Sequence, residues 1–210
     1  MTRTILAFGD SNTYGTPPMA SREGHLRLEK RWPVVMAGAL PCTLIEAGVG
    51  GRTAGNQHPA DGELYLDGPL GLQVALRGHG PIDELIIMLG TNDLQTRHGN
   101  TAVTVAAAIS KLLSIACGDE MQERHNGFRV TLICPPTILE GGTYAPEFAG
   151  ASEPSKHLAA QLKTLAELWG TRFLDAGDII ASDPLDGVHF SAQSHETLGL
   201  AVAELLATAS

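Results

Sequence analysis

The sequence predicts an α/β protein in which helices cover both faces of a five-stranded parallel sheet. Five short apolar runs recur along the 210 residues, and amphipathic helical patterns lie between and after them. The third and fourth runs are nearly continuous in Leu, Ile, Val and Met rather than alternating. Such runs are typical of parallel strands that are buried on both faces.

The predicted strands follow one another along the chain at 5–8, 43–49, 84–90, 129–134 and 172–177. A short helix is expected at 31–40, and longer helices at 102–116, at 156–169 and in the last segment. In the longer helices, apolar residues recur at helical spacing: Val105, Ile109, Leu112, Leu113 and Ala116; Leu158, Leu162, Leu165 and Trp169; Leu198, Val202, Leu205 and Leu206. Alternation of strands and helices predicts a three-layer sandwich with crossover connections.

Two segments interrupt this alternation. Residues 50–81 and 135–154 carry many Gly and Pro residues, and we expect both to be long loops. Loops of this length within a compact domain are usually functional or form contacts between subunits. The chain has no internal repeat, and its length suits a single domain spanning 1–210.

The composition excludes several classes of partner. The formal net charge is −9 and no basic stripe is present, which argues against binding to nucleic acid or to anionic membranes. Three scattered cysteines do not form a disulfide framework. The sequence shows neither a signal peptide nor an apolar stretch of 18 residues, so a cytoplasmic protein is expected.

Polar residues follow the predicted strands where each strand ends. Ser11 follows the first strand, Gly50 the second and Asn92 the third, while Asp186 and His189 lie beyond the fifth. Ligands of an open parallel sheet bind outside the carboxyl ends of its strands. We therefore expect these five residues to converge on one edge of the sheet.

This set of side chains suits acyl transfer. Ser11 becomes a nucleophile when a base such as His189 removes its proton, and a carboxylate such as Asp186 orients the imidazole. The N–H groups of Ser11 and Gly50 and the amide of Asn92 are candidate donors to the oxyanion. Each residue alone is also compatible with ordinary turn chemistry. Their joint appearance after different strands favours a catalytic site.

Other motifs are incomplete. Residues 48–53 lack the third glycine of a dinucleotide-binding G-x-G-x-x-G loop, because Thr53 occupies its position. Thr13 likewise replaces the second glycine of the pentapeptide G-x-S-x-G. No His or Cys pair has zinc-ligand spacing, so neither a metal nor a cofactor is expected. The remaining histidines are predicted to be scattered surface or loop residues: His25, His58, His79, His98, His125, His157 and His195.

Four blocks of sequence resemble the SGNH, or GDSL, hydrolase family in the expected order: FGDSNTYG, EAGVGGRT, LGTND and DGVHF. The resemblance covers nearly the whole chain. It implies Ser11 as the nucleophile, Gly50 and Asn92 in the oxyanion hole, and Asp186 and His189 as the other catalytic residues. Asn12 departs from the family pattern, since the family name has Leu at this position.

Similarity extends further to the bacterial arylesterase and acyltransferase branch, in RWP at 31–33, LIIMLGTND and FLDAGDIIASDPLDGVHF. This branch implies a flavodoxin-like sheet, the SGNH hydrolase fold, esterase activity on short acyl esters and a homo-oligomer, often an octamer. Its long loops build subunit contacts and narrow the active-site entrance. We expect residues 55–81 and 138–153 to do the same here.

The sequence therefore predicts a serine esterase acting on a small-molecule acetyl or aryl ester. The same site could pass the acyl group to an alcohol, deacetylate sugars or cleave thioesters. A flavodoxin-like nucleotide-binding module is disfavoured by the incomplete glycine motif and by the negative charge.

Residues beside the predicted catalytic groups are candidates for a small acyl pocket: Asn12, Tyr14, Thr91, Val188 and Phe190. Plain packing in the core is the alternative role for these side chains.

Overall fold

The computed structural model describes residues 2–21, 26–55 and 62–208. Five parallel strands form one sheet in the order β2-β1-β3-β4-β5, which confirms the predicted sheet. The strands are β1 (Arg3–Gly9), β2 (Cys42–Gly48), β3 (Glu84–Met88), β4 (Arg129–Cys134) and β5 (Arg172–Asp175).

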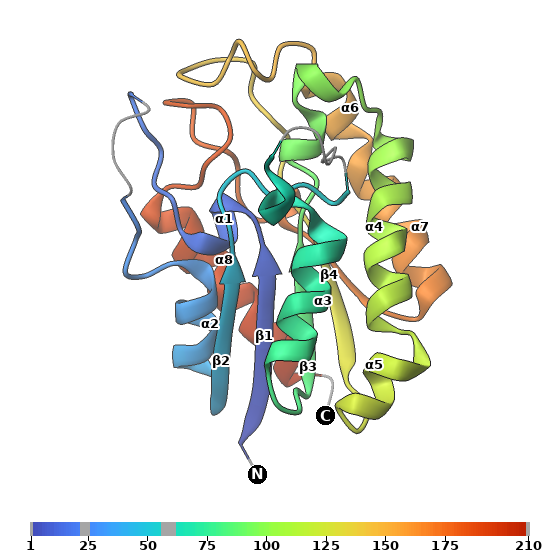
Figure 1. The fold of residues 1–210 in the computed structure, drawn as a ribbon. Helices are drawn as coiled ribbons and strands as arrows, with labels where there is room; N and C mark the ends of the chain where they lie inside the picture. The colour runs from blue at the N-terminus through green and yellow to red at the C-terminus, as the bar shows by residue number, and fades with distance from the viewer. Residues whose placement is uncertain (1, 22–25, 56–61, 209–210) are drawn as a thin grey trace.

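Helices lie on both faces of this sheet (Figure 1). The α-helices are α1 (Ser11–Tyr14), α2 (Trp32–Ala39), α3 (Gly68–Gly78), α4 (Ala102–Ala116), α5 (Asp119–Arg124), α6 (Ser152–Lys156), α7 (Leu158–Trp169) and α8 (Ala192–Ala207). The short 3-10 helices are η2 (Leu64–Leu66), η3 (Asn92–Leu94), η4 (Thr96–His98) and η5 (Ala176–Asp178).

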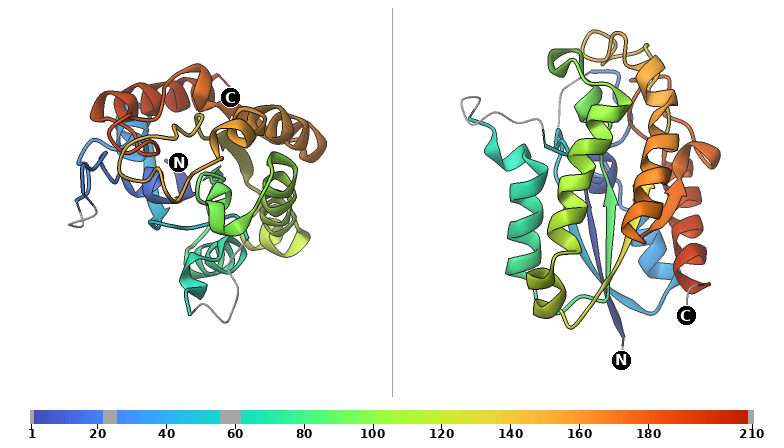
Figure 2. Two further views of the ribbon diagram at one scale, coloured as in Figure 1. Left: turned by 90° about the horizontal axis from the view of Figure 1, so that it is seen from above. Right: turned by 90° about the vertical axis from the view of Figure 1, so that its right-hand side faces the viewer.

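Each face of the sheet has its own hydrophobic core. Successive side chains of a strand point to opposite faces, so in β1 Ile5 joins one core while Leu6 joins the other. Helices α2 and α8 cover the Ile5 side, whereas α3, α4 and α7 cover the Leu6 side, as the two views of Figure 2 show. The predicted three-layer arrangement is therefore correct.

The prediction that 50–81 is entirely loop is wrong for α3. Asp67 caps this helix by accepting a hydrogen bond from Leu70 N, and Pro69 lies in its first turn. Leu72 and Leu76, one turn apart, are fully buried against the sheet. Burial of this apolar stripe stabilises α3 despite its three glycines, Gly68, Gly71 and Gly78.

The order of the strands places a crevice above β1. The chain passes from β1 to β2 through α2 on one face, and from β2 to β3 through α3 on the other. The strand order thus reverses at β1, and ligands bind at such switch points. The segments after β1 and β3, which carry Ser11 and Asn92, flank this crevice.

Within the described residues, no helix combines the length and the apolar character needed to cross a membrane.

Candidate active site

Ser11 lies in a tight turn directly after β1. Asp10 is the N-cap of α1, and its Oδ1 accepts a hydrogen bond from Asn12 N at 2.9 Å. Two glycines give this turn room: a Cβ on Gly9 would lie 2.1 Å from Thr13 Oγ1, and a Cβ on Gly48 would lie 2.3 Å from Tyr14 N. The turn therefore packs against the ends of β1 and β2 and holds Ser11 at the rim of the sheet.

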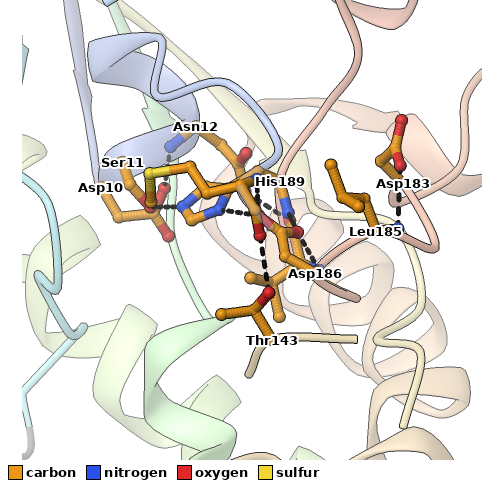
Figure 3. A network of polar contacts seen from close by, with 10 residues as sticks. Asp10, Ser11, Asn12, Thr143, Asp183, Leu185, Asp186 and His189 are labelled. Atoms are coloured by element: carbon orange, nitrogen blue, oxygen red, sulfur yellow. Dashed lines mark hydrogen bonds and ion pairs between the residues drawn. The ribbon is translucent and has the colours of Figure 1, made fainter. Parts of the chain in front are cut away.

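The structure brings Ser11, His189 and Asp186 into one hydrogen-bonded chain (Figure 3). Ser11 Oγ lies 2.9 Å from His189 Nε2, although 178 positions separate the two residues. His189 Nδ1 lies 2.7 Å from Asp186 Oδ2. A hydroxyl, an imidazole and a carboxylate in this order form the arrangement that activates a serine nucleophile.

The Asp186 carboxylate is buried but well supplied with donors. Its Oδ1 accepts hydrogen bonds from Val188 N and His189 N, and its Oδ2 accepts one from Met19 N at 3.0 Å. Burial alone would raise the pKa of Asp186, but hydrogen bonds and the charge of His189 outweigh it and lower that pKa below the usual value. Asp186 is therefore held as a carboxylate.

A glycine turn and an amide side chain lie beside Ser11. Arg52 N donates to Val49 O at 3.1 Å and closes a turn with Gly50 and Gly51 at its centre. Gly51 adopts a φ of +81°, a left-handed conformation that favours glycine. Both glycines and Asn92 line the same cavity as Ser11.

The Asn92 side chain is held on both of its polar atoms. Its Nδ2 donates to Arg52 O at 3.1 Å and to Asp10 Oδ2 at 3.3 Å. Its Oδ1 accepts from Gln95 Nε2 at 3.1 Å, which fixes the orientation of the amide. The donor group of Asn92 is thus positioned before any ligand arrives.

Two buried ionisable groups, Asp10 and Arg52, lie beneath this site and interact through charge. Burial raises the pKa of Asp10 to about 6, against the opposing effects of Asn12 N–H, His189 and Arg52. Burial lowers the pKa of Arg52 to about 10, against the attraction of Asp10. The Arg52 guanidinium stacks 4.3 Å from the Phe8 ring centre and donates to the carbonyls of Gly9 and Ala47, so it ties together the ends of β1 and β2.

A cavity of about 580 Å³ opens above these groups. Its walls combine seven apolar or aromatic side chains with six polar ones and three glycines. The lining residues are Ser11, Tyr14, Thr16, Met19, Leu26, Gly48, Val49, Gly50, Gly51, Thr91, Asn92, Gln95, Tyr144, Phe148, Val188 and His189.

Two residues that the sequence suggested for the pocket lie elsewhere. Asn12 is buried beneath the turn, and its Nδ2 donates to Val188 O at 3.0 Å. Phe190 is fully buried in the core on the α2 and α8 side. Each of them follows a residue that lines the cavity, Ser11 or His189, and its own side chain points in another direction, into the protein. Tyr14, Thr91 and Val188 line the cavity.

Several cavity residues were missed. Tyr144 packs edge-on against His189, with ring centres 5.6 Å apart, and Phe148 lies nearby on the same wall. Both come from the predicted loop 138–153, consistent with its expected place at the entrance. In the described part of 55–81, no residue lines the cavity. Met19 and Gln95 carried no signal in the sequence beyond their proximity to motif residues.

Two of the histidines that were predicted to be surface or loop residues are buried. His125 is buried: its Nδ1 accepts from Ile82 N, and its Nε2 lies 3.0 Å from Leu76 O. His195 is fully buried beside Phe190, its Nδ1 accepts from Trp32 N, and burial lowers its pKa to about 4. Both are structural. His25 and His58 lie outside the described residues.

The Ser-His-Asp arrangement of hydrolases recurs on unrelated folds and is recognised by its geometry, and here it lies above the carboxyl edge of a parallel sheet. The sequence model of the GDSL-like lipase/acylhydrolase family matches residues 7–197, so the chain belongs to that family. It is therefore a carboxylic ester hydrolase.

Solved structures resemble the whole chain. Est24, a carbohydrate acetylesterase from Sinorhizobium meliloti, is 34% identical with a TM-score of 0.89. The native aryl esterase of M. smegmatis is 30% identical with a TM-score of 0.91. A putative arylesterase from Agrobacterium tumefaciens str. C58 is 33% identical with a TM-score of 0.85. Each alignment covers 99% of both chains. A search of curated protein sequences gave no match.

Proposed function

We propose that the protein hydrolyses short-chain acyl esters through a covalent acyl-enzyme on Ser11. The observation that carries this proposal is the 2.9 Å contact between Ser11 Oγ and His189 Nε2, with Asp186 on the other ring nitrogen. His189 takes the Ser11 proton as Oγ attacks the ester carbonyl. Asp186 stabilises the imidazolium that forms.

The developing oxyanion needs donors that are already in place. In the proposed mechanism these are Ser11 N–H, a peptide N–H of the turn at Gly50, and Asn92 Nδ2. At rest Asn92 Nδ2 donates to Arg52 O at 3.1 Å and to Asp10 Oδ2 at 3.3 Å, so in the proposed mechanism the oxyanion shares the hydrogen of the longer bond, the one to Asp10. His189 then protonates the leaving alcohol, and water releases the acyl group by the reverse sequence of steps.

The shape of the cavity supports a small neutral ester. A cavity of about 580 Å³ lies within the range of about 300–1,000 Å³ that is usual for small-molecule sites. Tyr14, Tyr144 and Phe148 supply aromatic walls that suit an aryl group. Deacetylation of a sugar is a second candidate, because the similar Est24 is a carbohydrate acetylesterase. Thioesters are a further candidate substrate.

Hydrolysis of p-nitrophenyl acetate by the wild type and by Ser11→Ala tests the mechanism. The variant should lose at least about 10⁴-fold in kcat because no other group can form the acyl-enzyme. Its thermal unfolding should match that of the wild type. Full activity in a folded Ser11→Ala protein would reject the proposal.

Transfer of the acyl group to an alcohol in place of water is part of the proposal, and product analysis in aqueous alcohol measures it. We also propose a cytoplasmic homo-oligomer in which loop 138–153 and the described part of 55–81 contact neighbouring subunits. Sedimentation velocity tests the assembly, since a monomer would remove that part of the proposal. Cell fractionation tests the location.

A further inference from the structure

Residues 139–144 are held tightly against the turn that carries Asp186. Two glycines allow this approach: a Cβ on Gly187 would lie 2.3 Å from Leu139 O, and a Cβ on Gly142 would lie 2.3 Å from Leu185 O. Both glycines have positive φ values. Three backbone hydrogen bonds join the two segments: Leu139 N to Gly187 O, Thr143 N to Leu185 O, and Tyr144 N to Asp186 O.

The Thr143 side chain extends this contact to a third segment. Its Oγ1 donates to Met19 O at 2.7 Å. Met19 N in turn donates to Asp186 Oδ2 at 3.0 Å, across 167 positions of sequence. Met19 is thus held at its carbonyl by Thr143 while its N–H points at Asp186 (Figure 3 shows Thr143 and Asp186).

The oxygen that Met19 contacts is the one that orients His189. Asp186 Oδ2 accepts from both Met19 N and His189 Nδ1, whereas Oδ1 accepts from two backbone N–H groups of its own turn. A second donor on Oδ2 fixes the plane of the carboxylate relative to the imidazole. It also reduces the negative charge that Oδ2 presents to the ring.

We propose that Thr143 is a positioning residue of the hydrolytic reaction, whose hydroxyl holds Met19 so that Met19 N–H aligns Asp186 with His189. This inference rests on the proposed role of Ser11, His189 and Asp186. Met19 and Tyr144, the neighbour of Thr143, both line the cavity. We call the two contacts from Thr143 Oγ1 to Met19 O and from Met19 N to Asp186 Oδ2 the clamp. The clamp therefore links the wall of the substrate cavity to the Asp186 carboxylate.

Other charged groups also face His189 and must stay constant in a test. Asp186 contacts it directly, while Asp10 from the end of β1 and His195 from α8 interact with it through charge. The Tyr144 ring covers one edge. Thr143→Val is nearly isosteric, changes no charge and removes only the hydroxyl.

The test is the pH profile of kcat/KM for p-nitrophenyl acetate in wild type, Thr143→Val and Thr143→Ser. Thr143→Val should lower kcat/KM about threefold to tenfold, because the carboxylate loses its fixed orientation. The midpoint of its acid limb should shift, since Met19 N–H no longer holds Oδ2 against the His189 ring. Thr143→Ser keeps the hydroxyl and should behave as wild type.

Thr96→Val is the matched control. The Thr96 hydroxyl donates to Glu147 O and Ala149 O, so it holds the same loop at a distance from Met19. Its loss should leave the midpoint unchanged. An equal shift in Thr96→Val, or a wild-type rate and midpoint in Thr143→Val, overturns the proposal. Thr143→Ala provides the same test if the valine variant is unstable.

A proton NMR titration of the His189 ring in wild type and Thr143→Val tests the clamp without turnover. The midpoint in the variant should again differ from that of wild type, and identical midpoints overturn the clamp. Failure of the proposed function is a separate result: wild type and Ser11→Ala would then hydrolyse the ester equally, whatever the titration shows.

Discussion

Two buried carboxylates at opposite ends of the sheet are paired in different ways. Glu84 lies at the amino end of β3, and Asp10 follows the carboxyl end of β1; each is 1% exposed. Glu84 accepts a hydrogen bond from Thr131 Oγ1 and forms an ion pair with Arg172, both at 2.7 Å. A buried charge is stable in the fold only when such partners replace water.

Asp10 has neutral hydrogen-bond donors instead. They are the N–H of Asn12 and the side-chain amide of Asn92, and the pKa of Asp10 rises to about 6 because burial outweighs them. Asp10 also adjoins the cavity through Ser11 and Asn92. The comparison teaches that burial alone does not mark a functional site. A buried charge that is incompletely compensated and adjoins a cavity does mark one.

The largest expected effect is a loss of kcat on substitution of Asp186, at the carboxyl end of the sheet. Asp186→Asn should lower kcat by about 10⁴-fold, because the amide would present its NH2 to His189 and impose the wrong tautomer. Esterase kinetics with p-nitrophenyl acetate measure this loss. Asp183→Asn is the control, since the Asp183 side chain accepts from Leu185 N on the same loop and the variant keeps the backbone bonds of Asp183, so it should keep wild-type kcat. Equal kcat values for the two variants would contradict the assignment.

A substitution at the amino end of the sheet should lower the stability of the fold and leave the catalytic rate unchanged. Arg172→Met leaves Glu84 buried without its cation and should cost about 3–5 kcal/mol in the free energy of unfolding. Denaturant unfolding measures this cost, while kcat/KM of the folded variant should be unchanged. Arg77→Met is the matched control: its ion pair with Glu120 is largely exposed, and its loss should cost less than about 1 kcal/mol. A catalytic defect in folded Arg172→Met would break the comparison.

The Asn92→Ala variant should show that the Asn92 amide, at the carboxyl edge of the sheet, stabilises the transition state. Loss of one oxyanion donor lowers kcat by about 10²–10³-fold with little change in KM. Gln95→Leu removes only the group that orients the Asn92 amide, so its loss of kcat should be smaller, about tenfold or less. A rise in KM with unchanged kcat in Asn92→Ala would instead indicate ground-state binding.

The smallest expected effect is the change of the free energy of unfolding with pH that results from the ionisation of Asp10. Its folded pKa of about 6 exceeds its ordinary value of 3.8, so its contribution to stability is fully present below pH 3.8 and is lost as pH rises through about 6. Asp10→Asn should therefore gain about 2–3 kcal/mol relative to wild type between pH 4 and pH 7. Urea unfolding across this range measures the difference, and a constant difference would contradict the shifted pKa.

Strands β3 and β4 could be predicted because burial on both faces leaves nearly continuous apolar runs. The edge strands β2 and β5 are only partly buried and their runs are interrupted by charged residues, but the observed strands overlap every predicted run. Helix α3 was missed because Gly68, Pro69, Gly71 and Gly78 hide an apolar stripe whose burial depends on the sheet.

In the candidate site, too, some features could be predicted from the sequence and others could not. Ser11, Asn92 and His189 follow strand ends or form local motifs, so chain order and parallel topology predicted that they converge. The contacts of Met19 with Asp186 and of Asn92 with Asp10 span 167 and 82 positions and depend on how loops pack. The burial of His125 and His195 likewise depends on helix packing that no local pattern reveals.

The most direct measurement of the central claim is peptide mass mapping after reaction with a short-chain p-nitrophenyl phosphonate ester. Attack by a serine on phosphorus releases p-nitrophenol and leaves a stable adduct on the nucleophile. We predict one phosphonyl group per chain on the peptide that contains Ser11, formed at the same rate as activity is lost and far more slowly in His189→Ala. Complete inactivation with Ser11 unmodified, or with the group on another residue, would contradict the account.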